Sequence, residues 1–142
     1  DPLTRQLAAR ALAWTDPPEA TALLEPLMQD PAEEVRTELL LVMPRLSDPD
    51  RWRLAERGLD DSSPFLRAEA CRLLGGSARA EAGAQVLPLL GDRDTLVRIS
   101  AAAALAQLGH QPALDPLQEL ARRTRDEDER AYYLEAARRL GG

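Results

Sequence analysis

Hydrophobic positions recur along the chain with the spacing of one face of an α-helix. At five places, apolar or small residues stand three, four and seven positions after an arginine, as Leu39, Leu40 and Met43 do after Arg36. Because a helix has about 3.6 residues per turn, these offsets bring the side chains to one side of it. The arginines that lead the five series are Arg5, Arg36, Arg67, Arg98 and Arg130.

The same positions define an internal repeat of about 31 residues. A second apolar segment precedes each of the last four arginine-led helices, and acidic residues mark the turn between the two. No part of the sequence shows the strict alternation of a half-buried strand. The pattern therefore predicts an all-α chain of about four helix pairs preceded by one leading helix. The predicted first helices of the pairs cover roughly 18–29, 50–59, 80–91 and 112–124.

Each predicted helix pair has only a narrow apolar stripe, which it cannot bury alone. Stacking of neighbouring pairs buries such stripes in one continuous core, as in a solenoid. The first unit has only a second helix, so we expect the chain to be a piece of, or a domain in, a longer protein. Its edge, which includes Leu3, Leu7 and Leu12, leaves self-association open. The predicted units, which form a single domain, are about 1–15, 16–47, 48–77, 78–110 and 111–142.

Three prolines lie inside the predicted first helices, each directly before a leucine. A proline inside a helix removes one backbone hydrogen bond and bends the helix axis. We therefore expect kinks at Pro26, Pro88 and Pro116.

Composition and charge exclude several classes of function. One Cys and one His can form neither an intramolecular disulfide nor a Cys/His zinc site. A formal net charge of −6, with arginine supplying all 18 basic residues, lacks the basic surface of a nucleic-acid binder. No apolar run reaches the roughly 18 residues of a membrane span, and no secretory signal opens the chain. We expect a cytoplasmic, bacterial protein without cofactor, metal, nucleic-acid or membrane partner.

Three repeats share an aspartate, five intervening residues and an arginine, and the first helices share a Pro-Leu pair. With these features the chain resembles HEAT repeats, in particular the short bacterial type found in proteins similar to phycobilisome-lyase subunits. The resemblance covers essentially the whole chain and implies a right-handed α–α superhelix whose second helices line a concave groove. It also implies a binding scaffold for another protein rather than a reaction. The shared pairs are Asp30 with Arg36, Asp61 with Arg67, and Asp92 with Arg98.

The last repeat departs from this pattern. Thr124 stands at the place of the turn aspartate, and Glu129 stands where the three preceding repeats have valine or leucine before the arginine. We interpret this unit as a capping repeat with a more polar outer side, in which Asp126 takes the role of the turn acid.

The recurring arginine has two interpretations. A row of guanidinium groups would suit an acidic ligand, whereas pairing with turn carboxylates of its own or the neighbouring repeat would form a structural ladder. The planar guanidinium makes two hydrogen bonds to one carboxylate, which favours the ladder. The predicted ladder consists of Asp30, Arg36, Asp61, Arg67, Asp92, Arg98 and Arg130.

Positions two, five and nine residues after each arginine lie away from the apolar stripe. If the second helices line a concave side, these positions form the floor of the groove. Both signs of charge and a few large apolar side chains occur there, so the floor is either a partner-binding surface or an ordinary solvated face. The candidate groove residues are Arg10, Trp14, Glu38, Leu41, Arg45, Glu69, Arg72, Ser100, Gln107, Tyr132, Glu135 and Arg139.

Four other features have ordinary structural interpretations. Trp52 suits packing between first helices, and Cys71 occupies a core position. His110 follows a helix end, where it can interact with the helix dipole. The acidic run 126–129 suits a helix start better than a cation site, because it lacks the ligand spacing of a calcium loop.

We therefore expect a non-catalytic protein-interaction scaffold that binds its partner through the groove lined by the second helices. The alternative is an accessory subunit of an enzyme, similar to bilin lyase subunits. A DNA-binding enzyme similar to the HEAT-like alkylpurine glycosylases would need a strongly basic groove, and here glutamates oppose the arginines. The chain itself is not expected to be an enzyme.

Overall fold

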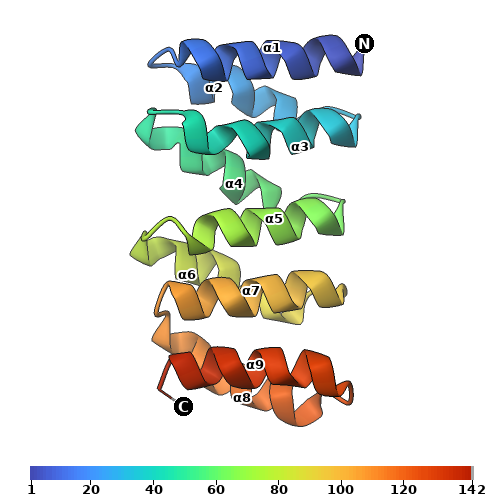
Figure 1. Ribbon diagram of the computed structural model, residues 1–142, viewed down its shortest axis with the longest axis vertical. Coiled ribbons are helices and arrows are strands. Elements are labelled where there is room, and N and C mark those ends of the chain that lie inside the picture. The colour runs from blue at the N-terminus through green and yellow to red at the C-terminus, as the bar shows by residue number, and fades with distance from the viewer. Residues whose placement is uncertain (142) are drawn as a thin grey trace.

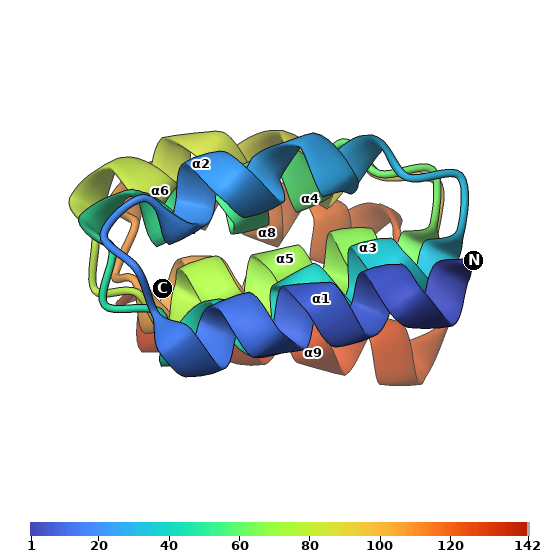
Figure 2. The same ribbon diagram turned by 90° about the horizontal axis from the view of Figure 1, so that it is seen from above.

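The computed structural model describes residues 1–141, which form two layers of helices stacked along one axis (Figure 1). Seen from above, the second helices of the repeats lie in one layer and the first helices in the other (Figure 2). Residues 1–141 contain no strand, which confirms the predicted all-α solenoid. The second helices are α1 (Pro2–Thr15), α3 (Glu33–Val42), α5 (Pro64–Gly75), α7 (Thr95–Gln107) and α9 (Glu127–Arg139). The first helices are α2 (Ala20–Leu24), α4 (Trp52–Gly58), α6 (Ala80–Val86) and α8 (Leu114–Arg123).

Turn residues determine where the second helices begin. The Asp94 carboxylate accepts a hydrogen bond from the Leu96 backbone N–H at 2.9 Å, and the Asp126 carboxylate accepts one from Glu129 at 2.8 Å. These N-caps satisfy N–H groups that the first turn leaves without a partner. Helix α5 begins instead at Pro64, where the missing N–H has no bond to lose.

At two of the three prolines the α-helix changes into a 3₁₀ helix instead of only bending. Helices α2 and α6 continue as 3₁₀ helices over Glu25–Gln29 and Leu87–Gly91, with Pro26 and Pro88 in their first turns. Pro116 differs from the expectation, because it lies in the first turn of α8, directly after a 3₁₀ helix, and not in the interior of a longer α-helix. Three shorter 3₁₀ helices span Met43–Arg45, Pro49–Arg51 and Gln111–Ala113.

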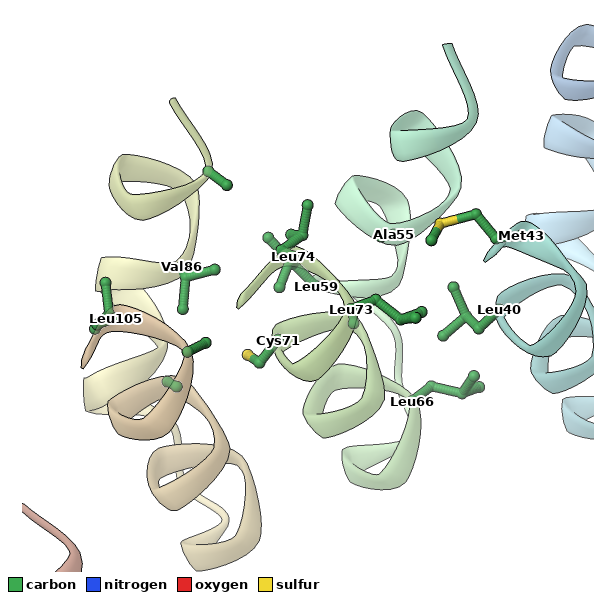
Figure 3. Packing of buried hydrophobic residues seen from close by; sticks show 14 of the residues in the cluster. Leu40, Met43, Ala55, Leu59, Leu66, Cys71, Leu73, Leu74, Val86 and Leu105 are labelled. Atoms are coloured by element: carbon green, nitrogen blue, oxygen red, sulfur yellow. The ribbon is translucent and has the colours of Figure 1, made fainter. Parts of the chain in front are cut away.

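A continuous apolar core runs between the two layers and through the repeats. Figure 3 shows its centre, where Leu40 of α3, Met43 directly after α3, Leu66 and Leu74 of α5, and Leu105 of α7 are fully buried. Few aromatic side chains are needed, because close helix contacts are filled by leucine and alanine. None of the helices in the described part of the chain has the length and apolar run needed to span a bilayer.

Within residues 1–141, helices α5 and α7 of neighbouring repeats pack more extensively than any other pair of elements. Gly75 lies against the backbone of Ala104 there. A Cβ atom added to Gly75 would stand 2.8 Å from the Ala104 Cα, which is too close for ordinary packing. The absence of a side chain at Gly75 therefore sets how tightly the two helices pack.

Three residues whose side chains could have had a chemical role are buried or half-buried in the fold. Trp52 is half-buried against the core, as expected for a packing residue. Cys71 is fully buried, and burial raises the pKa of its thiol to about 12, so the thiol is protonated at neutral pH. His110 is half-buried, and its ring packs directly on Gly83 of α6.

Candidate functional site

The arginine ladder links each repeat to the next through the turns. Arg36 Nε and Nη2 donate to the two carboxylate oxygens of Asp61 at 2.8 and 3.1 Å, across the repeat boundary. Its remaining nitrogen, Nη1, donates to the Asp30 carbonyl of its own turn at 2.8 Å. The sequence left open whether the arginine pairs within its own repeat or with its neighbour. The guanidinium does both, with a carbonyl on one side and a carboxylate on the other.

The same arrangement recurs at Arg67. It donates to both Asp92 carboxylate oxygens at 2.8 and 3.0 Å, and to the Asp61 carbonyl at 2.9 Å. Arg5, which was not included in the predicted ladder, pairs with Asp30 at 2.5 and 2.9 Å in the same way. Each ladder aspartate also accepts a backbone N–H from its own turn, so carboxylates and turns form one hydrogen-bonded row. These N–H donors are Ala32, Ser63 and Asp94, at 2.9, 2.8 and 2.9 Å.

The last step of the ladder differs from the prediction. Arg98 donates to Glu129 at 2.9 and 2.6 Å, and to the Tyr133 hydroxyl at 3.1 Å. The role assigned to Asp126 is wrong, since its carboxylate caps α9, and the longer side chain of Glu129 reaches the guanidinium instead. Arg130 donates only to backbone carbonyls, chiefly Thr124 at 3.1 and 2.8 Å. It has no carboxylate partner within residues 1–141.

The ladder carboxylates make stability depend on pH. Arg67 holds the pKa of Asp92 below its ordinary value, against the opposing effect of burial, and Arg5 does the same for Asp30. Because these pKa values are lower in the folded than in the unfolded chain, the stabilisation is complete above about pH 5 and is lost as the pH falls.

We expect the free energy of unfolding in urea to fall steadily between about pH 5 and pH 2. The variant Asp92→Asn removes one titrating group, so it should be less stable at pH 7 and lose less stability over this range. A wild-type stability that stays constant through the acid range, or an equally steep loss in Asp92→Asn, would contradict the role of this pair.

Most charges predicted for the groove floor are paired with one another. Arg10 of α1 donates to both oxygens of Glu38 on α3 at 2.9 and 2.8 Å, and Glu38 is only 5% exposed. Arg72 pairs with Glu69 one turn earlier on the same helix. Glu135 likewise pairs with Arg138, which was not among the predicted groove residues. Glu38 was predicted on the groove floor, but it is buried and Arg10 covers it.

Other predicted groove residues are exposed at separate places on the second-helix layer. Trp14 and Leu41 are exposed by 70% and 57%. Arg45 stacks on the Trp14 ring, with its guanidinium carbon 4.7 Å from the ring centre. Arg139 is exposed at the end of α9.

A hollow of about 360 Å³ lies on the second-helix layer between α5, α7 and α9, and we call it the α5–α7 trough. It brings together predicted groove residues from three helices with apolar neighbours that the prediction missed. Phe65 and Leu96 stand two positions before Arg67 and Arg98, and this offset falls on the same helix face as the predicted groove residues. The repeat spacing could therefore have predicted them. The predicted residues at the trough are Glu69, Arg72, Ser100, Gln107 and Tyr132. The additional ones include Phe65, Leu96 and Ile99, whereas Ala103 stands at the predicted floor position five residues after Arg98.

The trough is hollow because α7 has small residues on this face. Ala103 stands where the two preceding repeats have Leu41 and Arg72, and Ser100 stands where they have Glu38 and Glu69. Around this floor the side chains of Phe65 and Tyr132 are exposed by 51% and 56%.

The predicted N-terminal edge lies outside the trough. At the N-terminal edge Leu3 and Leu7 are 62% and 52% exposed, but Leu12 packs against the core, so its inclusion in the exposed edge is wrong. Self-association through this edge stays a prediction. Within residues 1–141 no group of three or more His, Cys, Asp or Glu side chains is placed to hold a metal ion.

Comparison with known proteins assigns the family. The sequence profile of HEAT repeats matches residues 52–138, more than half of the chain. The solved structure of human deoxyhypusine hydroxylase in complex with glycerol superposes with a TM-score of 0.62 at 20% sequence identity. The match covers 98% of this chain but 45% of the hydroxylase chain, so this chain spans less than half of that protein's length. No curated protein matches the chain in sequence.

The hydroxylase match corrects the expectation that this chain is not an enzyme. That expectation followed from the fold, and an enzyme has the same fold, so the fold does not argue against catalysis. At 20% identity the likeness shows the fold alone, whereas the HEAT profile covers most of the helices described above. The chain belongs to the HEAT-repeat family.

Proposed function

We propose that the chain is a protein-binding solenoid whose partner docks on the second-helix layer, centred on the α5–α7 trough. The observation that carries this proposal is the trough itself, a hollow of about 360 Å³ rimmed by exposed apolar side chains. Single exposed apolar residues are common on protein surfaces, but contiguous ones mark interaction sites. Phe65, Leu96 and Tyr132 are each more than half exposed around this one hollow.

The charges of the layer support the same location. Arg10 is paired with Glu38, and Arg72 is paired with Glu69. A partner that covers these side chains therefore does not bury an unpaired charge, which would be costly. Tyrosine, tryptophan and arginine are the residue types that contribute most at protein interfaces. Tyr132 lies at the trough, and the stacked pair of Trp14 and Arg45 lies on the same layer.

The buried lone thiol of Cys71 supports a reducing, cytoplasmic compartment.

The variant Ala103→Arg tests this proposal. It fills the floor of the trough with a side chain that α5 already accommodates at the matching position, Arg72, so the fold should tolerate it. We expect capture of the cellular partner by the tagged protein to fall at least about tenfold, which corresponds to about 1.4 kcal/mol of binding free energy.

The matched control is Ala84→Arg, which makes the same change at an exposed position of α6 in the other layer. Capture should be unaffected in this variant, and both variants should keep the wild-type circular dichroism. A partner retained equally by Ala103→Arg and the wild type would overturn the proposed docking site.

A further inference from the structure

The trough has few free hydrogen-bonding groups. Its walls are helices, whose backbone N–H and C=O groups are already bonded, and Glu69 and Arg72 bind each other. The remaining polar groups of the lining are the side chains of Ser100 and Gln107 and the hydroxyl of Tyr132. An extended segment would bury backbone groups here without partners, which is costly. A helix satisfies its own backbone and needs only an apolar side for this surface.

The shape of the trough also fits a helix. It follows α5 from Phe65 to Arg72 and α7 from Leu96 to Gln107. At about 1.5 Å per residue these stretches are roughly 10 and 16 Å long, or about two to three helical turns. The small side chain of Ala103 between them leaves a groove in which the side-chain ridge of a third helix can pack.

Charged side chains border the trough at opposite ends with opposite signs. Phe65 and Leu96 belong to a row of equivalent positions, two residues before each repeat arginine and near the helix starts. In this row the repeats of α3 and α9 have Glu34 and Asp128, both exposed. Near the helix ends, in the row that contains Gln107, Arg139 of α9 is exposed, whereas the Arg45 guanidinium stacks on Trp14 of α1, away from the trough. The repeats beside the trough therefore place two carboxylates near one end and the Arg139 guanidinium near the other.

We propose that the occupant of the trough is an amphipathic α-helix of a partner protein that runs antiparallel to α5 and α7. Helices favour acidic residues in their first turns and basic residues in their last turns. An antiparallel helix places its acidic start near Arg139, and its basic end near Glu34 and Asp128. This inference rests on the proposed function and names the chemistry of the partner at the same surface.

Two synthetic peptides of about 18 residues and identical composition test the proposal. Both have one leucine and alanine stripe and lactam bridges on the opposite face, which hold them helical regardless of charge order. The first peptide has glutamates in its first half and lysines in its second, and the other has the reverse order. Binding of the fluorescently labelled peptides to the whole chain is measured by anisotropy at low salt. We expect the first peptide to bind at least about tenfold more tightly than the second, and Ala103→Arg but not Ala84→Arg to remove its binding.

The outcomes separate this inference from the proposed function. Equal binding of the two peptides, or tighter binding of the reversed one, overturns the antiparallel assignment. If neither peptide binds while partner capture still depends on Ala103, the helical occupant is wrong and the docking site stands. If partner capture does not depend on Ala103, the docking site itself is wrong.

Discussion

Replacing Arg67 by glutamine is expected to lower the free energy of unfolding by about 3 kcal/mol. The guanidinium joins Asp92 of the next repeat to the Asp61 carbonyl of its own, and its side chain is 9% exposed. Glutamine cannot bridge the two turns, so the Asp92 carboxylate, 12% exposed, keeps its charge without its partner. Breaking a largely buried ion pair costs much more than losing an exposed one.

Arg130→Gln is the matched control for this experiment. It removes the same side chain from the same repeat position, where no carboxylate of residues 1–141 accepts from it. We expect a loss of no more than about 1 kcal/mol in urea unfolding, typical of single hydrogen bonds to carbonyl groups. Equal losses in the two variants would mean that the bond between repeats does not stabilise the fold.

Gly75→Ala is expected to destabilise the protein by about 2 kcal/mol, although alanine is normally the better helix residue. The new methyl group would stand 2.8 Å from the Ala104 Cα, and a backbone atom cannot move aside as a side-chain tip can. Helices α5 and α7 must therefore separate, which loosens the most extensive contact between repeats.

The next residue supplies the control. A Cβ atom on Gly76 would have no neighbour closer than 3.7 Å, and its φ of −84° suits any residue. Gly76→Ala should therefore be neutral or stabilise by up to about 1 kcal/mol, because it restricts the unfolded chain. Thermal and urea unfolding of the two variants give the comparison, and a neutral Gly75→Ala would show that the helices do not pack this closely.

Helix pairs and ladder positions were predictable because they repeat. Apolar offsets after each arginine recur in every unit, and an aspartate precedes three of the arginines by six positions. The direction of pairing was not predictable, since spacing within one repeat does not reveal how far the next repeat is shifted. Glu129 was missed for a related reason: its longer side chain reaches Arg98 from the first turn of α9, a position where other repeats have apolar residues.

The groove floor shows a second limit of sequence reasoning. Helical periodicity placed Arg10 and Glu38 on one surface, but their pairing depends on the contact between α1 and α3. The trough depends on two small residues of α7, Ser100 and Ala103, next to large apolar neighbours from α5 and α9. A hollow of this kind arises from the difference between repeats, whereas the sequence pattern reveals what they share.

Site-specific photo-crosslinking tests the proposed docking surface most directly. A benzophenone amino acid is placed at Tyr132, at the trough, or at Ala84, on the exposed side of α6. Each version is irradiated in cells of the source organism, and adducts are detected by their mass shift. If a partner docks at the trough, Tyr132 gives a discrete crosslinked protein and Ala84 gives none. A discrete adduct from Ala84 with none from Tyr132 would contradict docking on the second-helix layer.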